Sequence, residues 1–318
     1  MKKFCLLVCL ITFKFGLAQK EIVVAQDGTG QYRTVQEAFD AIPMHNDKKV
    51  VIYIKNGTYK EKLHLDSTKD YVTIIGQDKF GTILTYDDHN GKMGPNGKVI
   101  NTMTSASCLI RANDFTARNL TIQNDAGFYA GQAVALESDG TREQYYNCRL
   151  VGFQDVLFTN NPGSLQYFKD CYIEGTTDFI FGSATCWFAH CHIHSKKNSH
   201  VTAASTPADH LFGYVFDDCV LTADTSLHQV SLGRPWRPYA CVIYMHCYMG
   251  PQIKPEGWSN WNKTDNYKTT RYSEYDNYGP GASIVSRVSW SKQLTNQEAA
   301  EITLKKVLHG WQPSECTP

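Results

Sequence analysis

The sequence predicts an all-β solenoid, in which short strands wind into coils that stack along one axis. Three polar residues, Gln132, Asp155 and Asp178, recur at a fixed interval of 23 residues. A second repeat, in which a polar residue precedes Cys, any residue and an apolar residue, is centred on Cys148, Cys171, Cys191, Cys219 and Cys247. Repeats of about 20–30 residues with short strand-like centres are typical of stacked coils. Equivalent side chains of neighbouring coils should therefore lie about 4.8 Å apart on one face.

The N-terminal elements should be strands interrupted by one helix. Apolar runs followed by glycine-containing turns predict strands at 22–25, 50–54 and 71–75. Thr34, with Glu37 three residues later, forms a capping box that predicts a short amphipathic helix to about Ile42. A solenoid has to cover its open end, and this helix should do so.

Two long loops and a C-terminal helix should complete the solenoid. Residues 86–106, rich in Gly, Asn and Asp, predict a loop, and residues 251–280 break the repeat and should form long loops over one face. Thr295, with Glu298 three residues on, should begin a C-terminal capping helix over 295–309.

Residues 1–18 have the features of a secretory signal peptide. Two lysines precede an apolar run over 4–13, and a small residue precedes the expected cleavage point. The run is too short for a transmembrane helix, so we expect a secreted or periplasmic protein without stable membrane insertion. A lipid anchor on Cys9 is the alternative, which the bulky Val8 disfavours. No linker divides residues 19–318, so we expect one domain there.

The charge of the chain argues against a nucleic-acid partner. Its 31 Lys and Arg balance 31 Asp and Glu, and removing residues 1–18 takes away three lysines and no acid, which leaves a net charge of −3. Nucleic-acid-binding domains normally need a basic field. An anionic polymer would have to be met by local basic residues, or be partly neutralised.

The cysteines and histidines are better explained by packing than by metal binding. Nine cysteines follow residue 18, an odd number that cannot pair completely within one chain. The repeat favours a column of small buried residues, although stacking would also bring neighbouring cysteines within disulfide range. His190, His192 and His194 alternate and so share one strand face. We expect that face to be exposed and polar, with a metal site as the alternative.

Asp155 and Asp178 are candidate catalytic carboxylates. Two stacked carboxylates cannot both ionise freely, so one should keep its proton while the other serves as a nucleophile or base. Gln132 and Gln154 add neutral N–H donors of the kind that a developing oxyanion requires. A pair of solvated aspartates at turns is the alternative.

Arg234 and Trp236 lie in the unusual run Leu-Gly-Arg-Pro-Trp. The guanidinium would pair with a carboxylate and keep it ionised, and the indole offers a flat face to a sugar ring. A purely structural turn is the alternative.

At this point the chain resembles the pectin methylesterase (pectinesterase) family. The matching segments run in the order of that family: Gly-Gln-Tyr-Arg-Thr-Val at 30–35, Gly-Gln-Ala-Val-Ala-Leu at 131–136, Gln-Asp-Val-Leu at 154–157, Asp-Phe-Ile-Phe-Gly at 178–182, Leu-Gly-Arg-Pro-Trp at 232–236, Pro-Glu-Gly-Trp at 255–258 with Trp261, and Arg-Val-Ser-Trp at 287–290. The resemblance covers about residues 22–311 and implies a right-handed parallel β-helix. It implies a secreted, monomeric bacterial enzyme that hydrolyses the C6 methyl esters of homogalacturonan (pectin) and releases methanol, without a metal or other cofactor.

The resemblance also assigns roles to the candidate residues. It implies Asp178 as the nucleophile, Asp155 as the general acid and later base, Gln132 and Gln154 as the oxyanion site, and Arg234 as the group that orients Asp178.

Trp236 and Phe179 would line the sugar cleft. Val156 departs from the Thr that is usual in the family, away from the chemistry. The atypical segment 127–131 would alter a substrate subsite.

Two other functions remain open from the residues alone. A β-helix glycosidase or lyase acting on pectin would also use two carboxylates about 5 Å apart. The two glutamines favour acyl transfer, because glycoside cleavage develops positive charge at the ring rather than an oxyanion. A non-catalytic carbohydrate-binding solenoid would explain the coils and aromatic residues, but not the acids, amides and arginine together.

Overall fold

The computed structural model describes residues 21–262 and 264–314. The signal peptide predicted for residues 1–18 lies outside the described residues. Within the described residues, no helix is both long enough and apolar enough to cross a membrane.

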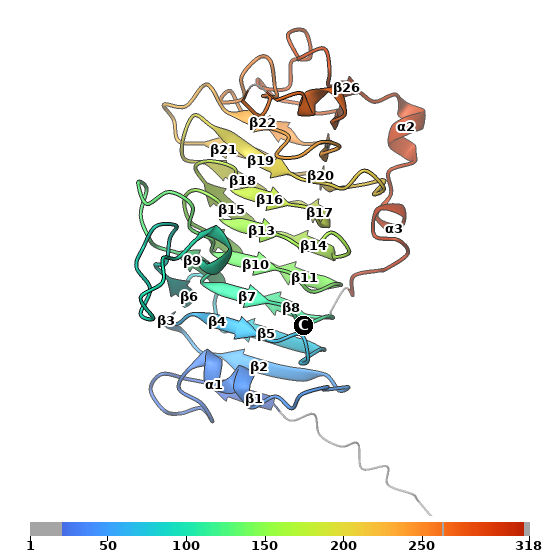
Figure 1. Ribbon diagram of the computed structural model, residues 1–318. Coiled ribbons are helices and arrows are strands. Elements are labelled where there is room, and N and C mark those ends of the chain that lie inside the picture. Colours follow the sequence, from blue (N-terminus) through green and yellow to red (C-terminus); the bar gives the residue numbers. More distant parts are fainter. Residues whose placement is uncertain (1–20, 263, 315–318) are drawn as a thin grey trace, which may run out of the picture.

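The described chain winds into a parallel β-helix with three sheets (Figure 1). Sheet A contains β1 (Glu21–Val24), β2 (Val50–Ile54), β5 (Val72–Gly76), β8 (Thr116–Arg118), β11 (Glu143–Tyr146), β14 (Leu165–Lys169), β17 (Thr185–Ala189), β20 (Tyr214–Asp217), β23 (Cys241–Met245), β25 (Arg271–Tyr275) and β26 (Lys292–Gln293). Sheet B contains β3 (Gly57–Lys60), β6 (Thr82–Tyr86), β9 (Thr121–Asn124), β12 (Arg149–Val151), β15 (Tyr172–Gly175), β18 (His192–Ser195), β21 (Val220–Ala223) and β24 (Tyr248–Met249). Sheet C contains β4 (Leu63–Leu65), β7 (Cys108–Ile110), β10 (Leu136–Ser138), β13 (Leu157–Thr159), β16 (Ile180–Gly182), β19 (His200–Ala204) and β22 (Ser231–Gly233). Each regular coil visits sheets A, B and C in turn, as β11, β12 and β13 do.

The interior of the coils is packed by ladders of similar side chains. Phe188 stacks between Phe168 and Phe216, with ring centroids 4.8 and 4.4 Å apart. The predicted cysteine column is confirmed, because its members are buried free thiols: Cys148, Cys171, Cys191, Cys219 and Cys247. Buried aromatic and sulfur atoms thus provide the hydrophobic core that holds the coils together.

The polar residue before each of these cysteines makes the turn from sheet A to sheet B. Its φ angle lies between 49° and 55° in every case, at Asn147, Asp170, His190, Asp218 and His246. Asn, Asp and His are the residues other than glycine that adopt this left-handed conformation most readily. The left-handed backbone at this position explains why the residue before each cysteine is polar. The cysteine that follows it points into the core.

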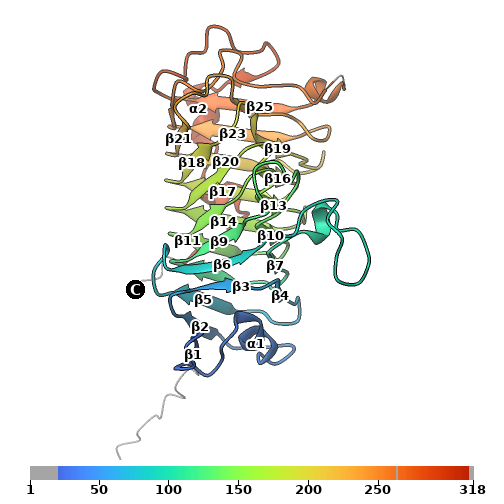
Figure 2. The ribbon, with the colours of Figure 1, turned by 90° about the vertical axis from the view of Figure 1, so that its left-hand side faces the viewer.

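The predicted capping box and N-terminal helix are confirmed. Thr34 and Glu37 cap α1 (Val35–Asp40), which ends two residues before the expected Ile42. The helix lies against the first coils at the N-terminal end of the stack (Figure 1). The loop after β6 carries a short 3₁₀ helix, η1 (Thr102–Thr104), and stands out from the stack near β7 (Figure 2). A second one, η2 (Asn266–Lys268), lies in the predicted loops over 251–280.

The predicted C-terminal helix start is confirmed, because Thr295 and Glu298 form the capping box, but the prediction of one capping helix over 295–309 is wrong. The chain forms α2 (Asn296–Ala300) and α3 (Leu304–Val307), which run along the outer face of sheet A instead of covering the end of the coil (Figure 1). Thr303 starts the second helix by accepting a hydrogen bond from the Lys306 amide. The large apolar side chains on that face, including Trp187 and Val215, need cover from water, and Val307 packs in the same cluster.

Candidate active site

Asp155 and Asp178 lie at successive turns from sheet B to sheet C. Each precedes its strand of sheet C by two residues, and the register of β13 and β16 pairs Leu157 with Ile180. Both aspartates have positive φ angles, 64° and 49°. Main-chain hydrogen bonds hold the turns together, with the Asp155 amide donating to the Thr177 carbonyl oxygen over 3.1 Å. The two carboxyl groups are thus neighbours, one coil apart.

The equal spacing of 23 residues does not extend to Gln132. The main chain of Gln132 bridges to Gln154 rather than to Asp155, and Leu136 pairs with Leu157. The coil between Gln132 and Asp155 is shorter than the next one, because turn lengths vary from coil to coil. The interval of 23 residues therefore predicts correctly that the aspartates stack. It predicts wrongly that Gln132 stacks on Asp155.

The predicted polar site residues line one pocket of about 280 Å³. Its lining comprises Thr102, Met103, Gln132, Gln154, Asp155, Asp178, Phe181, Ala203, Arg234, Trp236 and Trp261. Sheet C supplies the floor, and η1 and the loops after β22 supply the walls. The pocket combines acids, amides and a cation with aromatic rings, which suits a sugar that carries a carboxyl ester.

Arg234 holds Asp178 through two parallel hydrogen bonds. Its Nε and Nη2 donate to Oδ1 and Oδ2 of Asp178 over 3.0 and 2.6 Å. The guanidinium also lies 4.0 Å from the centre of the Trp261 ring, so its plane is fixed from a second side. The sequence motifs include Trp261, but they give no sign of this contact.

The two carboxyl groups differ in how firmly they hold a proton. Burial raises the pKa of Asp155 well above its ordinary value, and the negative charge of Asp178 raises it further. Burial also raises the pKa of Asp178, but the paired Arg234 opposes that shift directly. The neighbouring charges therefore favour a protonated Asp155 beside an ionised Asp178.

The amide of Gln132 is oriented by Asn90, a residue that the sequence did not single out. The Nδ2 group of Asn90 donates to Oε1 of Gln132 over 3.1 Å, and its main-chain amide donates to the Gln132 carbonyl oxygen over 2.8 Å. Because the amide oxygen is engaged, the NH₂ group of Gln132 is turned away from Asn90 as a donor. Asn90 lies in an irregular loop, where no repeat could indicate it.

The prediction that Phe179 lines the sugar cleft is wrong. Its side chain is fully buried in the interior of the coil. Asp178 is in the left-handed conformation, so the residue after it points inward, as each cysteine does after its own turn residue. Phe181 lines the pocket instead, 4.3 Å from Phe158 and 6.0 Å from Trp236 between ring centroids.

The expected polar character of the histidines is confirmed, but the single exposed strand face is not: His192 and His194 lie on β18 and are partly buried, whereas the exposed His190 lies in the turn before it. His190 pairs with Asp218, while His192 and His194 both contact the Thr222 hydroxyl, over 2.6 and 2.8 Å. Among the residues that the structure describes, no group of three or more His, Cys, Asp or Glu side chains is arranged to hold a metal ion.

Comparison with known proteins gives one consistent result. The family model described as Pectinesterase matches residues 21–311. Pectinesterase 31 of Arabidopsis thaliana is 38% identical over 281 residues, which cover 87% of this chain and 88% of that protein. The solved structure of the pectin methylesterase from carrot superimposes with a TM-score of 0.83 at 32% identity, covering 91% of this chain and 93% of that one. Pectin methylesterase PemA from Erwinia chrysanthemi gives a TM-score of 0.80 at 28% identity, covering 92% and 98%.

These likenesses confirm the expected right-handed parallel β-helix. They span nearly all of the described chain and agree between the sequence and the structure comparisons. The chain therefore belongs to the pectinesterase family.

Proposed function

We propose that this esterase removes methyl esters from pectin by nucleophilic attack of Asp178, with Asp155 as the acid and then the base. Family membership identifies the hydrolytic removal of methyl esters from pectin. We assign the two roles because the two carboxyl groups have different surroundings. Arg234 forms a bidentate pair with Asp178, whereas burial and the charge of Asp178 favour the protonated form of Asp155. The ionised partner is the nucleophile, and the protonated one is the acid.

In the first half of the reaction, an Asp178 carboxylate oxygen bonds to the ester carbon. The carbonyl oxygen becomes an oxyanion, which the amide NH₂ groups of Gln132 and Gln154 stabilise. Collapse of this intermediate breaks the bond to the methoxy oxygen, which takes the proton of Asp155 and leaves as methanol. An acyl–aspartate anhydride and an ionised Asp155 remain.

In the second half, Asp155 takes a proton from water as the water oxygen attacks the acyl carbon. The same oxyanion site serves again, and the bond to Asp178 breaks. A galacturonate carboxylic acid is released and ionises, Asp178 returns as a carboxylate, and Asp155 has regained its proton. No redox partner is needed to balance the two halves.

The aromatic rings around the carboxyl groups suit the sugar of the substrate. Trp236, Trp261 and Phe181 line the pocket together, and flat rings pack well against the C–H face of a pyranose. The segment 127–131 stands beside Gln132, and its Tyr129 is 95% exposed. This tyrosine is available to contact a sugar outside the pocket and to alter one subsite.

The proposal also covers the setting of the enzyme. It is a secreted or periplasmic bacterial monomer, whose signal peptide ends at residue 18 and whose single domain is 19–318. The basic and apolar pattern of the first 18 residues supports secretion, and one uninterrupted β-helix supports the single domain.

Product analysis separates esterase action from the two alternatives. Highly methylated pectin should release methanol with time and show no new reducing ends. Reducing ends or unsaturated products without methanol would indicate a glycosidase or lyase. Binding of pectin without either product would indicate a carbohydrate-binding solenoid.

Arg234→Lys should lower turnover on the order of 10²-fold while keeping the positive charge. Lysine loses both the planar fork that holds Asp178 and the stacking on Trp261, and small misplacements of reacting groups have effects of this size. Initial rates of methanol release measure the loss. Arg33→Lys, an exchange at the N-terminal end of the coil, is the control and should stay near the unaltered rate. An equally active Arg234→Lys variant would show that the pairing does not position the nucleophile.

A further inference from the structure

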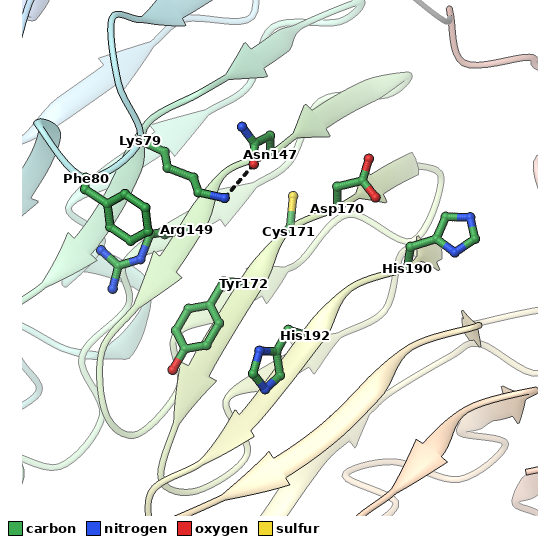
Figure 3. Close-up of a pocket in the computed structure, with 9 residues that line it drawn as sticks. All are labelled: Lys79, Phe80, Asn147, Arg149, Asp170, Cys171, Tyr172, His190 and His192. Carbon is green, nitrogen blue, oxygen red and sulfur yellow. Dashed lines mark hydrogen bonds between the residues drawn. The ribbon is translucent and has the colours of Figure 1, made fainter. Parts of the chain in front are cut away.

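A second groove, of about 490 Å³, lies where the chain turns from sheet A into sheet B. Its lining comprises Lys79, Phe80, Asn147, Arg149, Asp170, Cys171, Tyr172, His190 and His192 (Figure 3). These residues come from the turn before β6 and from the first residues of β12, β15 and β18 with the turns that precede them. The groove shares no lining residue with the catalytic pocket, which lies at the other end of the sheet B strands.

One end of this groove presents two cations beside the ring of Phe80. The guanidinium of Arg149 lies 5.0 Å from the centre of the Phe80 ring and 5.6 Å from that of Tyr172. Lys79 Nζ donates to Oδ1 of Asn147 over 2.6 Å, which keeps the ammonium at the groove (Figure 3). Phe80 is 62% exposed, so most of its ring is open to a ligand in the groove.

The acidic lining residue of the groove, Asp170, lies at its other end. Glu174 accepts a hydrogen bond from the Tyr172 hydroxyl over 2.8 Å, but its charge is paired with Lys196 over 3.0 Å. Asp170 is near His190 and away from Arg149 (Figure 3), and His190 itself pairs with Asp218 over 2.9 Å. The chain as a whole has no net positive charge. The end that carries Lys79 and Arg149 is therefore a local basic patch on a protein whose formal net charge is zero.

We propose that this groove binds a de-esterified segment of galacturonan, the product of the esterase reaction, and so holds the enzyme on its polymer. The inference rests on the proposed function. A galacturonate unit has an apolar C–H face for the rings of Phe80 and Tyr172, and a carboxylate for Arg149 and Lys79. A methyl-esterified unit has the same face but no charge, so the groove distinguishes product from substrate.

The position of the groove makes it a tether and not a subsite. Arg149 and Asp155 belong to the same coil and are six residues apart, which corresponds to at most about 20 Å of extended chain. They face different sides of the coil, so only a long polymer can reach both sites by bending. Binding at one site then raises the effective concentration of ester groups at the other.

The test uses a double variant, Phe80→Ala with Arg149→Gln, and affinity electrophoresis in gels containing polygalacturonate. We expect binding of this polymer to weaken by about tenfold or more. The matched control, Lys48→Gln, also removes one positive charge, from an exposed position elsewhere, and should bind as the unaltered protein does. Melting temperatures check the fold, and Phe80→Ala alone, a change at an exposed ring, repeats the test if the double variant is unstable.

Three outcomes would overturn the tether. They are unchanged binding in the groove variant, an equal loss in the Lys48→Gln control, and an equal loss of binding to fully methylated pectin. Turnover of a short methylated trigalacturonate should stay within about twofold of the unaltered enzyme, since it cannot span both sites. If the unaltered enzyme releases no methanol from highly methylated pectin, the proposed function fails, whereas the electrophoresis still tests the groove.

Discussion

Asp178→Asn should abolish methanol release while leaving the fold intact. The amide cannot attack the ester carbon, and loss of a nucleophile typically lowers turnover on the order of 10⁴-fold or more. Asparagine tolerates the positive φ angle of 49° at this turn, and its oxygen still accepts one hydrogen bond from Arg234. The measurement is methanol released per unit time, with the melting temperature recorded for the same preparation.

Asp170→Asn is the matched control for this exchange. Asp170 also has a positive φ angle, 54°, but lies at a turn from sheet A to sheet B, outside the catalytic pocket. Its variant should hydrolyse a short methylated oligogalacturonide at the unaltered rate. Asp178 would not be the nucleophile if its folded Asn variant kept a rate comparable to that of Gln132→Ala.

Gln132→Ala should remain measurably active, with turnover reduced on the order of 10²–10³-fold. This is the usual effect of removing one donor from an oxyanion site. The acids and Arg234 are unchanged, so attack still occurs without one of its stabilising hydrogen bonds. Methanol release at saturating pectin separates this loss in turnover from any change in binding.

A glutamine outside the pocket provides the comparison. Gln123→Ala, on β9, removes the same side chain from sheet B and should leave turnover unchanged. Equal rates for the two variants would refute a role for Gln132 in the oxyanion site.

The coils were predictable because the interior of a β-helix limits residue size in every layer. Cys171 and Cys191 repeat since each layer offers the same small space, and a repeat of this kind is visible in one sequence. The capping box of Thr34 was predictable for a different reason, because it depends only on residues within one turn of a helix.

The incorrect predictions concern features that depend on the folded backbone and on residues far apart in the sequence. Phe179 was assigned to the cleft from the family resemblance, but the backbone conformation of Asp178 turns its ring inward. The residue that stacks on Gln132 in the next coil depends on the length of the intervening turn. The sequence interval alone does not predict that length. Asn90 and Trp261 approach the site from irregular loops, so only the folded chain brings them to it.

The left-handed turns have a consequence for how chemistry can arise on this scaffold. At each turn the backbone accepts few side chains other than glycine, mainly Asn, Asp and His. Two of these three can carry or exchange a proton, and the third can donate a hydrogen bond. Local geometry thus places a functional side chain in the same backbone conformation at five successive turns from sheet A to sheet B, from Asn147 to His246. Asp155 and Asp178 needed no departure from this rule, so a reactive pair can emerge on a β-helix without any strain beyond that which its architecture already contains.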